Sequence, residues 1–111
     1  MKNVYVVNKS CHDFSEATKV GNVIFMTTNS MNRFNLEKMH RVFSRYLEES
    51  HPEDFIVISG LTNMSVVAST IFASKHKRLN LLLWDSKRKK YKKESIFFKE
   101  YSFKKEGELK E

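Results

Sequence analysis

Apolar residues fall into five short runs that predict β-strands. Residues 4–7 and 22–28 are rich in β-branched and aromatic side chains, which suit the pleated surface of a sheet. Residues 54–59 and 79–85 are continuous apolar runs, as expected of central strands that are covered on both faces. Residues 91–98 mix lysines with apolar residues, which predicts an edge strand whose charges discourage further pairing.

Three other segments have the pattern of helices. In residues 35–50, apolar side chains recur at helical spacing, and Asn35 is a suitable N-cap. Residues 63–77 carry a second apolar stripe with Asn63 as the expected cap, and the serines on the opposite face allow this helix to lie close to a sheet. Residues 12–17 are expected to form one further helical turn.

The alternation of strands and helices predicts an α/β domain. The order strand, helical turn, strand, helix, strand, helix, strand, strand is typical of a mainly parallel sheet with helices packed on it. Right-handed crossovers then favour a small, doubly wound, Rossmann-like fold with a four- to five-stranded sheet. We expect the strand order 2-1-3-4, with the fifth strand as an antiparallel edge.

Length and composition fit one compact unit. A chain of 111 residues with 41% apolar content suits a single core. We expect one domain over residues 1–103, with a basic hairpin at 79–103, and a charged, disordered tail at 104–111. No apolar run approaches the roughly 18 residues of a membrane-spanning helix. Residues 1–10 lack the apolar stretch of a secretory signal. We therefore expect a cytoplasmic protein without membrane contact, and the single cysteine fits a reducing compartment.

The net charge of +7 is concentrated in one part of the chain. Residues 1–74 carry seven basic and seven acidic residues, whereas residues 75–105 carry twelve basic and three acidic ones. The densest basic run lies between Trp84 and residue 93, and cations beside aromatic rings can neutralise phosphates and stack on bases. This run predicts contact with nucleic acid or with an acidic protein, or else a solvated hairpin loop. Its candidate contact residues are Lys87, Arg88, Lys89, Lys90, Lys92 and Lys93.

Candidate ligand residues lie where the predicted strands end. In open parallel sheets, ligands bind at the C-terminal ends of neighbouring strands from which the chain departs in different directions. On the expected topology, residues 8–12 and 59–63 line one crevice. Gly60 would let the backbone approach a ligand, and the start of the next helix would offer N–H groups to an anion. Alternatively, Gly60 only permits a tight turn, because neither GxGxxG nor GxxxxGK[ST] is present. The candidate residues are Asn8, Lys9, Ser10, His12, Arg33, Ser59, Gly60, Thr62 and Asn63.

Catalysis has little support in the sequence. Residues 10–13 read SCHD, but neighbours on an extended loop point in different directions. We therefore favour Cys11 as a buried residue and Asp13 as a helix cap. The remaining catalytic arrangement pairs His12, as a base, with the Gly60 turn, which would hold the electrophile. No HExxH or other metal-ligand spacing appears, so we expect neither a metal nor a cofactor. The sequence leans against an enzyme without deciding the question.

Four segments together resemble a family of small proteins encoded by tailed bacteriophages. They are VVNKSCHDFSEA, NRF, EDFIVISGLTNM and HKRLNLLLWD, and the resemblance covers about residues 3–93. It implies an accessory protein that acts in the cytoplasm of an infected bacterial cell, and it carries over no catalytic residue. The lysine-rich end from Lys87 onward is longer and more basic than this family leads us to expect.

Two functions follow from these observations. The first is a non-enzymatic module that binds a nucleotide-like or other anionic small molecule in the crevice, and by analogy sequesters a host signalling nucleotide. The second is an interaction module whose basic third contacts nucleic acid or an acidic host protein. Either module could form a homo-oligomer, because so small a domain often buries an edge strand or a helix face against a copy of itself.

Overall fold

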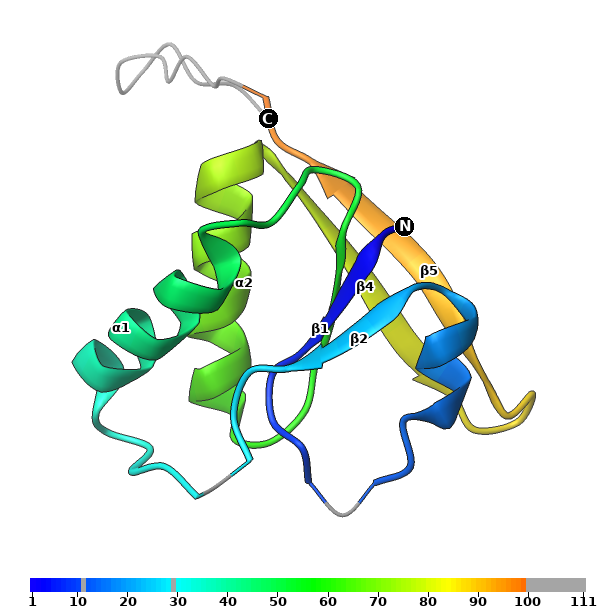
Figure 1. Ribbon diagram of the computed structural model, residues 1–111, viewed down its shortest axis with the longest axis horizontal. Helices are drawn as coiled ribbons and strands as arrows, with labels where there is room; N and C mark the ends of the chain where they lie inside the picture. Colours follow the sequence, from blue (N-terminus) through cyan, green and yellow to red (C-terminus); the bar gives the residue numbers. More distant parts are fainter. Residues whose placement is uncertain (11, 29, 100–111) are drawn as a thin grey trace, which may run out of the picture.

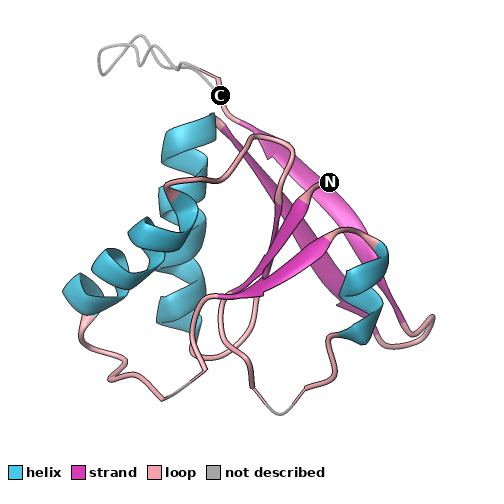
Figure 2. Cartoon of the chain, in the orientation of Figure 1, coloured by secondary structure: helices cyan, strands magenta, loops and turns pink. Residues whose placement is uncertain are grey.

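The described residues form a five-stranded mixed sheet with two α-helices and one 3-10 helix (Figures 1 and 2). The computed structural model describes residues 1–10, 12–28 and 30–99. Cys11 and the expected tail at 104–111 lie outside these residues. The strands are β1 (Asn3–Val6), β2 (Asn22–Phe25), β3 (Phe55–Val57), β4 (Arg78–Asp85) and β5 (Lys90–Phe97). The helices are η1 (Ser15–Lys19, a 3-10 helix), α1 (Leu36–Leu47) and α2 (Thr62–His76).

The sheet order is β2-β1-β3-β4-β5. Strands β2, β1, β3 and β4 are parallel to their neighbours, and β5 pairs with β4 in the antiparallel direction. The expected order of the first four strands and the antiparallel edge are therefore confirmed. Strand β1 lies in the interior of the sheet and is covered on both faces, since Tyr5 is buried in the core on one face and Val6 in the core on the other.

Both α-helices cover the same face of the sheet. Phe43 of α1 and Phe72 of α2 pack with Tyr5 in one core, whereas Val6 on the opposite face packs with Phe14 beside η1. Figure 1 shows α1 and α2 together on one side and η1 on the other. The expectation of a doubly wound fold is wrong, because the connection from β1 to β2 contributes a 3-10 helix of 5 residues instead of an α-helix. The α/β class and the mainly parallel sheet are confirmed.

Polar side chains define the starts of the first two helical segments. The Asn35 side chain accepts a hydrogen bond from the backbone N–H of Lys38 (3.1 Å), so the predicted cap of α1 is confirmed. The Asp13 carboxylate accepts from the backbone N–H of Ser15 (2.9 Å) at the start of η1. Both contacts satisfy an N–H group that a helix leaves without an internal partner.

The buried side-chain amide of Asn80 connects β4, β5 and the segment before β3, at the end of the sheet opposite the expected crevice. The Asn80 side-chain N–H groups donate to the backbone carbonyls of Pro52 (2.6 Å) and Asp54 (2.8 Å). The Asn80 side-chain oxygen accepts from the Ser95 hydroxyl (2.8 Å) and from the Arg78 guanidinium. One side chain therefore connects the segment before β3 to β4 and β5, and each of its polar atoms has a partner.

The C-terminal end of α1 is held against the C-terminal end of α2. The Ser50 hydroxyl donates to the carbonyl of Leu47 (2.6 Å) and lies 2.8 Å from Nε2 of His76. Because the hydroxyl hydrogen is already used, His76 is the donor, and Ser50 is not an activated nucleophile. Lys75 adds a charged hydrogen bond to the carbonyl of Leu47 (3.0 Å). Burial, and then the nearby charge of Lys75, lower the pKa of His76 below its ordinary value.

The lowered pKa of His76 predicts a loss of stability in mild acid. In the unfolded chain, His76 binds a proton near the reference pKa of histidine, about 6.5, whereas in the folded protein it resists protonation. The free energy of unfolding should therefore fall as the pH drops below about 6.5 and through the folded-state pKa. His76→Gln keeps an N–H donor without titrating, so it should reduce this fall, as measured by urea unfolding at a series of pH values. The matched variant His40→Gln, at an exposed position of α1, should keep it. An unchanged pH profile in His76→Gln would contradict the assignment.

Candidate functional site

The ends of β1 and β3 are joined side by side. The two strands pair in parallel register, with Val6 opposite Val57. Just past them, the backbone N–H of Asn8 donates to the Ser59 hydroxyl (3.0 Å), and that hydroxyl donates to the backbone carbonyl of Asn8 (2.8 Å). The expectation that residues 8–12 and 59–63 reach the same edge of the sheet is therefore confirmed for their described members.

We call the edge of the sheet where residues 8–10 meet residues 59–60 the crest. Gly60 lies there, between the two faces of the sheet. Its φ of +78° is a left-handed conformation that side chains rarely adopt. A Cβ at this position would lie 2.7 Å from Cβ of Asn8 and 3.4 Å from the sulfur of Met64. Glycine is therefore required here by backbone conformation and by packing, whether or not a ligand binds. This finding supports the structural interpretation of Gly60 without excluding a ligand above it.

A cavity of about 390 Å³ lies on the α-helical side of this crest. We call it the helix-side cavity. It is bounded by the loop after β1, the segment after β2 and the start of α2. Its polar lining residues are Asn8, Lys9, Ser10, Thr28 and Ser30, and Gly60 forms part of the wall.

The helix-side cavity is rich in hydrogen-bond donors. The hydroxyl oxygen of Ser10 is buried and has no hydrogen-bond partner among the described residues. The first N–H groups of α2, on Thr62 and Asn63, have no carbonyl partner within the helix, although neither residue lines the cavity, which the helix borders through Leu61. No acidic residue occurs in the first turn of α2, so the partial positive charge of the helix terminus is not offset there. The cavity is therefore suited to an acceptor group or an anion.

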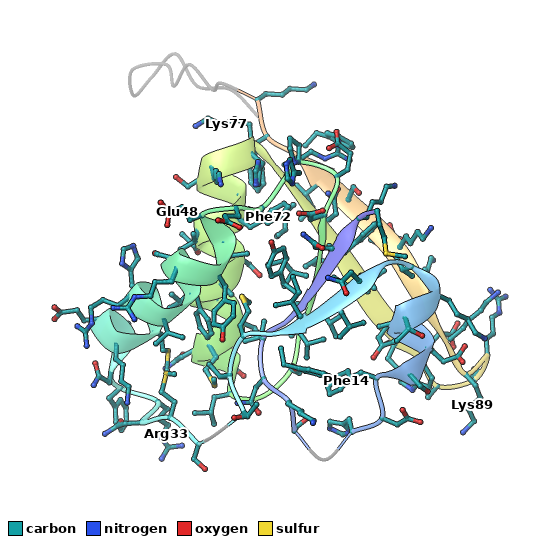
Figure 3. The ribbon with its side chains drawn as sticks, in the orientation of Figure 1. Phe14, Arg33, Glu48, Phe72, Lys77 and Lys89 are labelled. Atoms are coloured by element: carbon teal, nitrogen blue, oxygen red, sulfur yellow. The ribbon has the colours of Figure 1, made fainter. Side chains whose placement is uncertain are left out.

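The side chains of three predicted ligand residues make contacts within the protein. The ammonium of Lys9 lies 5.2 Å from the ring centroid of Phe25, although the residue lines the cavity. Arg33 is exposed, its guanidinium lies over the ring of Phe34, and it lines neither of the cavities at the crest (Figure 3). Asn63 is not the cap of α2, because Leu61 occupies that position and the Asn63 side chain donates to the carbonyl of Arg33 (2.7 Å).

A second cavity, of about 480 Å³, lies on the opposite side of the crest. We call it the aromatic cavity. It is lined by the aromatic side chains of His12, Phe14, Trp84 and Tyr91, and it shares Ser59 and Gly60 with the crest. The predicted ligand residues are thus divided, with Asn8, Lys9 and Ser10 on the helix side and His12 on the aromatic side.

The aromatic cavity was only partly foreseen from the sequence. Trp84 was expected near the end of its strand, but the contributions of Phe14 and Tyr91 were missed. The register of the hairpin places Tyr91 directly opposite Trp84, with ring centroids 5.1 Å apart in an edge-to-face arrangement. Two aromatic residues flanking a basic turn at equal distance were the available signal. The role of Phe14 depends on how the loop after β1 folds back, which periodicity does not encode.

The pKa values of two acidic groups in the aromatic cavity are shifted in opposite directions. Hydrogen bonds from Ser15 lower the pKa of the Asp13 carboxyl, so Asp13 carries its negative charge at neutral pH. Burial, and then the charge of Asp13, raise the pKa of the Tyr91 hydroxyl. Tyr91 therefore stays protonated. The cavity offers one anionic acceptor beside aromatic rings, in contrast to the donors on the helix side.

The basic run divides between a turn and a strand. Residues 86–89 form the turn, and β5 begins at Lys90, so the expected loop over 87–93 is too long. Lys92 is paired with Glu94 (3.4 Å), and Lys93 lies over the ring of Phe55. Because side chains alternate along a strand, these lysines point to opposite faces of the sheet. The turn at the tip carries the exposed Lys87, Arg88 and Lys89. Figure 3 labels Lys89 there.

Metal and membrane sites are not found in the described ranges. Residues 1–10, 12–28 and 30–99 contain no group of three His, Cys, Asp or Glu side chains placed to share a metal ion. No helix in the same part of the chain combines the length and the apolar character needed to cross a bilayer.

Comparison with known proteins gives one informative finding. A family model described as phage Pam3 gp32-like protein matches residues 2–97, which include all five strands and both cavities. No curated protein and no solved structure matches the chain. The resemblance to a phage family is thereby confirmed, whereas the Rossmann-like assignment is not.

The reciprocal contact at the crest predicts that Ser59→Ala destabilises the protein. The change removes both hydrogen bonds to the Asn8 backbone and leaves a half-buried N–H and carbonyl without that partner. We expect the free energy of unfolding to fall by about 1–2 kcal/mol, as measured by urea titration with circular dichroism. Ser86→Ala, at an exposed position of the hairpin turn, should change it by less than about 0.5 kcal/mol. Equal effects of the two variants would argue against a structural role for Ser59.

Proposed function

The chain belongs to the phage Pam3 gp32-like protein family, and from this premise we propose that it is a non-enzymatic phage accessory protein that binds a nucleotide-like or other anionic small molecule. The ligand lies at the C-terminal ends of β1 and β3. The protein acts in the cytoplasm of the host cell, where it sequesters a host signalling nucleotide. Family membership specifies no ligand, so the proposal rests on the chemistry of the crest.

The buried hydroxyl of Ser10 carries this proposal. A buried polar group without a hydrogen-bond partner costs about 1–3 kcal/mol. Ser10 lines the helix-side cavity, so a rotation of its side chain toward a ligand oxygen there would remove that cost. The N-terminus of α2 borders the same cavity through Leu61 and adds backbone N–H groups with a partial positive charge. Lys9 can add a full charge by turning away from the ring of Phe25, because its side chain is exposed.

The composition of the helix-side cavity favours binding over catalysis. Its described lining residues include no histidine, cysteine, aspartate or glutamate that could serve as a general base or a nucleophile. His12 is exposed and lies on the aromatic side of Gly60, away from these donors. Hydroxyl, amide and backbone N–H donors hold an anion without activating it.

The first prediction from this proposal concerns Ser10. A panel of nucleotides and inorganic phosphates, tested by thermal shift and calorimetry, should contain at least one strong stabiliser. Ser10→Ala should weaken its binding by roughly 10- to 100-fold, because a hydrogen bond to a charged group is lost. The matched variant Ser74→Ala, exposed near the end of α2, should bind as the unchanged protein does. A panel with no stabiliser, or a Ser10→Ala variant that binds normally, would contradict the proposal.

A second candidate function is supported by the exposed tip of the hairpin. Lys87, Arg88 and Lys89 lie together there and could contact nucleic acid or an acidic host protein, in a monomer or a homo-oligomer. The support is weaker, because Arg88 faces the carboxylate of Asp85 (4.0 Å) and the remaining lysines of the run are divided between two faces.

This candidate predicts steeply salt-dependent binding. Affinity for a single-stranded oligonucleotide should fall with rising salt, with a slope of about −0.7 per phosphate contact. Replacing Lys87, Arg88 and Lys89 by glutamine should reduce that slope by about 2. The control replaces Lys19, Lys38 and Arg41, which removes the same charge elsewhere and should leave the slope largely unchanged. Loss of binding in both triple variants would indicate an unspecific effect of net charge.

A further inference from the structure

The aromatic cavity and the helix-side cavity meet at Gly60, which lines both of them. The loop after β1 leads toward η1 on one face of the sheet, and the loop after β3 leads into α2 on the other. A ligand bound over Gly60 can therefore extend into both cavities. Each cavity lies within the range of about 300–1000 Å³ that small-molecule sites occupy.

Trp84 is unusually accessible for a side chain in such a position. It is the next-to-last residue of β4, yet 48% of its surface is exposed. Tyr91 packs against it from the neighbouring strand in an edge-to-face arrangement, with ring centroids 5.1 Å apart. Phe14 is buried and is held in place by an edge-to-face contact with Phe25, with ring centroids 5.8 Å apart. Rigid rings around an accessible indole are suited to stacking on a planar group.

Charge distinguishes the two ends of a ligand that crosses the crest. Asp13 lines the aromatic cavity as an anion, so it repels a phosphate and accepts hydrogen bonds from N–H groups. The helix-side cavity has donors and no acidic lining residue. A ligand with an anionic end and an N–H-bearing aromatic end therefore fits in one direction only. Its anionic end lies beside Ser10, and its aromatic end lies beside Trp84.

We propose that the aromatic cavity is the heterocycle subsite of the crest, so that the ligand class is a nucleotide whose base stacks on Trp84 while its phosphate lies in the helix-side cavity. Asp13 accepts from the exocyclic amino group of the base, which favours guanine, adenine and cytosine over uracil. This inference rests on the proposed function, because it adds the second end of the same ligand.

Trp84 is the single tryptophan of the chain, so its fluorescence reports on the subsite directly. The probes are the 5′-monophosphates of the four ribonucleosides, the matching nucleosides and ribose 5-phosphate. A nucleotide should change the Trp84 emission and bind at least about tenfold more tightly than ribose 5-phosphate, which lacks the base. Ribose 5-phosphate should bind without a change in emission.

Variants of Trp84 test whether the base stacks on the indole, independently of any effect on folding. Trp84→Ala should weaken nucleotide binding by on the order of 10- to 100-fold in calorimetry and leave the affinity for ribose 5-phosphate unchanged. Trp84→Phe should retain most of the affinity. Phe97→Ala serves as the matched control, because it removes an exposed aromatic ring from the far end of the same hairpin. Asp13→Asn provides a second test, since it should reduce the preference for guanine, adenine and cytosine over uracil.

The outcomes distinguish this inference from the proposed function. If ribose 5-phosphate binds as tightly as every nucleotide, the heterocycle subsite is wrong and anion binding stands. If a nucleoside binds as tightly as its monophosphate and loses affinity in Trp84→Ala, the subsite stands and anion binding is wrong. If none of the probes binds, both are wrong.

Discussion

The parallel pairing of β1 with β3 determines where the proposed ligand site lies. The pairing brings the ends of both strands to one edge of the sheet, and the reciprocal hydrogen bonds between Asn8 and Ser59 fix the two loops beside each other. Because the chain leaves β1 toward η1 and β3 toward α2, the loops separate to opposite faces above this edge. The position of the resulting crest follows from the strand order.

The side chains at the crest give its two sides opposite chemistry. Gly60 places no side chain at the crest, where a Cβ would collide with Asn8. On the helix side, the Ser10 hydroxyl and the N-terminus of α2 leave donors without acceptors. On the other side, Asp13 is an acceptor among aromatic rings. The proposed nucleotide would therefore use both sides of the crest, whereas a simple anion would use only one.

The sequence predicted the elements and their order more reliably than the positions of single side chains. Hydrophobic runs identified all five strands, and Asn35 was correctly assigned as a cap, because both signals are local. A helical turn after β1 was predicted, but not that this 3-10 helix covers the second face of the sheet, since the segment carries too few apolar residues to reveal its packing. Asn63 resembles a cap in sequence, but a tertiary contact with Arg33 decides its orientation. Such contacts between distant segments leave no periodic pattern.

The hairpin illustrates how one element can meet two demands. Tyr91 faces the aromatic cavity beside Trp84, whereas the alternate residue Lys92 points to the other face of β5. As the edge of the sheet, β5 exposes unpaired backbone groups, and a row of lysines discourages another strand from adding there. Protection of the edge is thus sufficient to explain the lysines within the strand. Only the tip, with Lys87, Arg88 and Lys89, carries charge that this role does not require, so any nucleic-acid contact must depend on the tip.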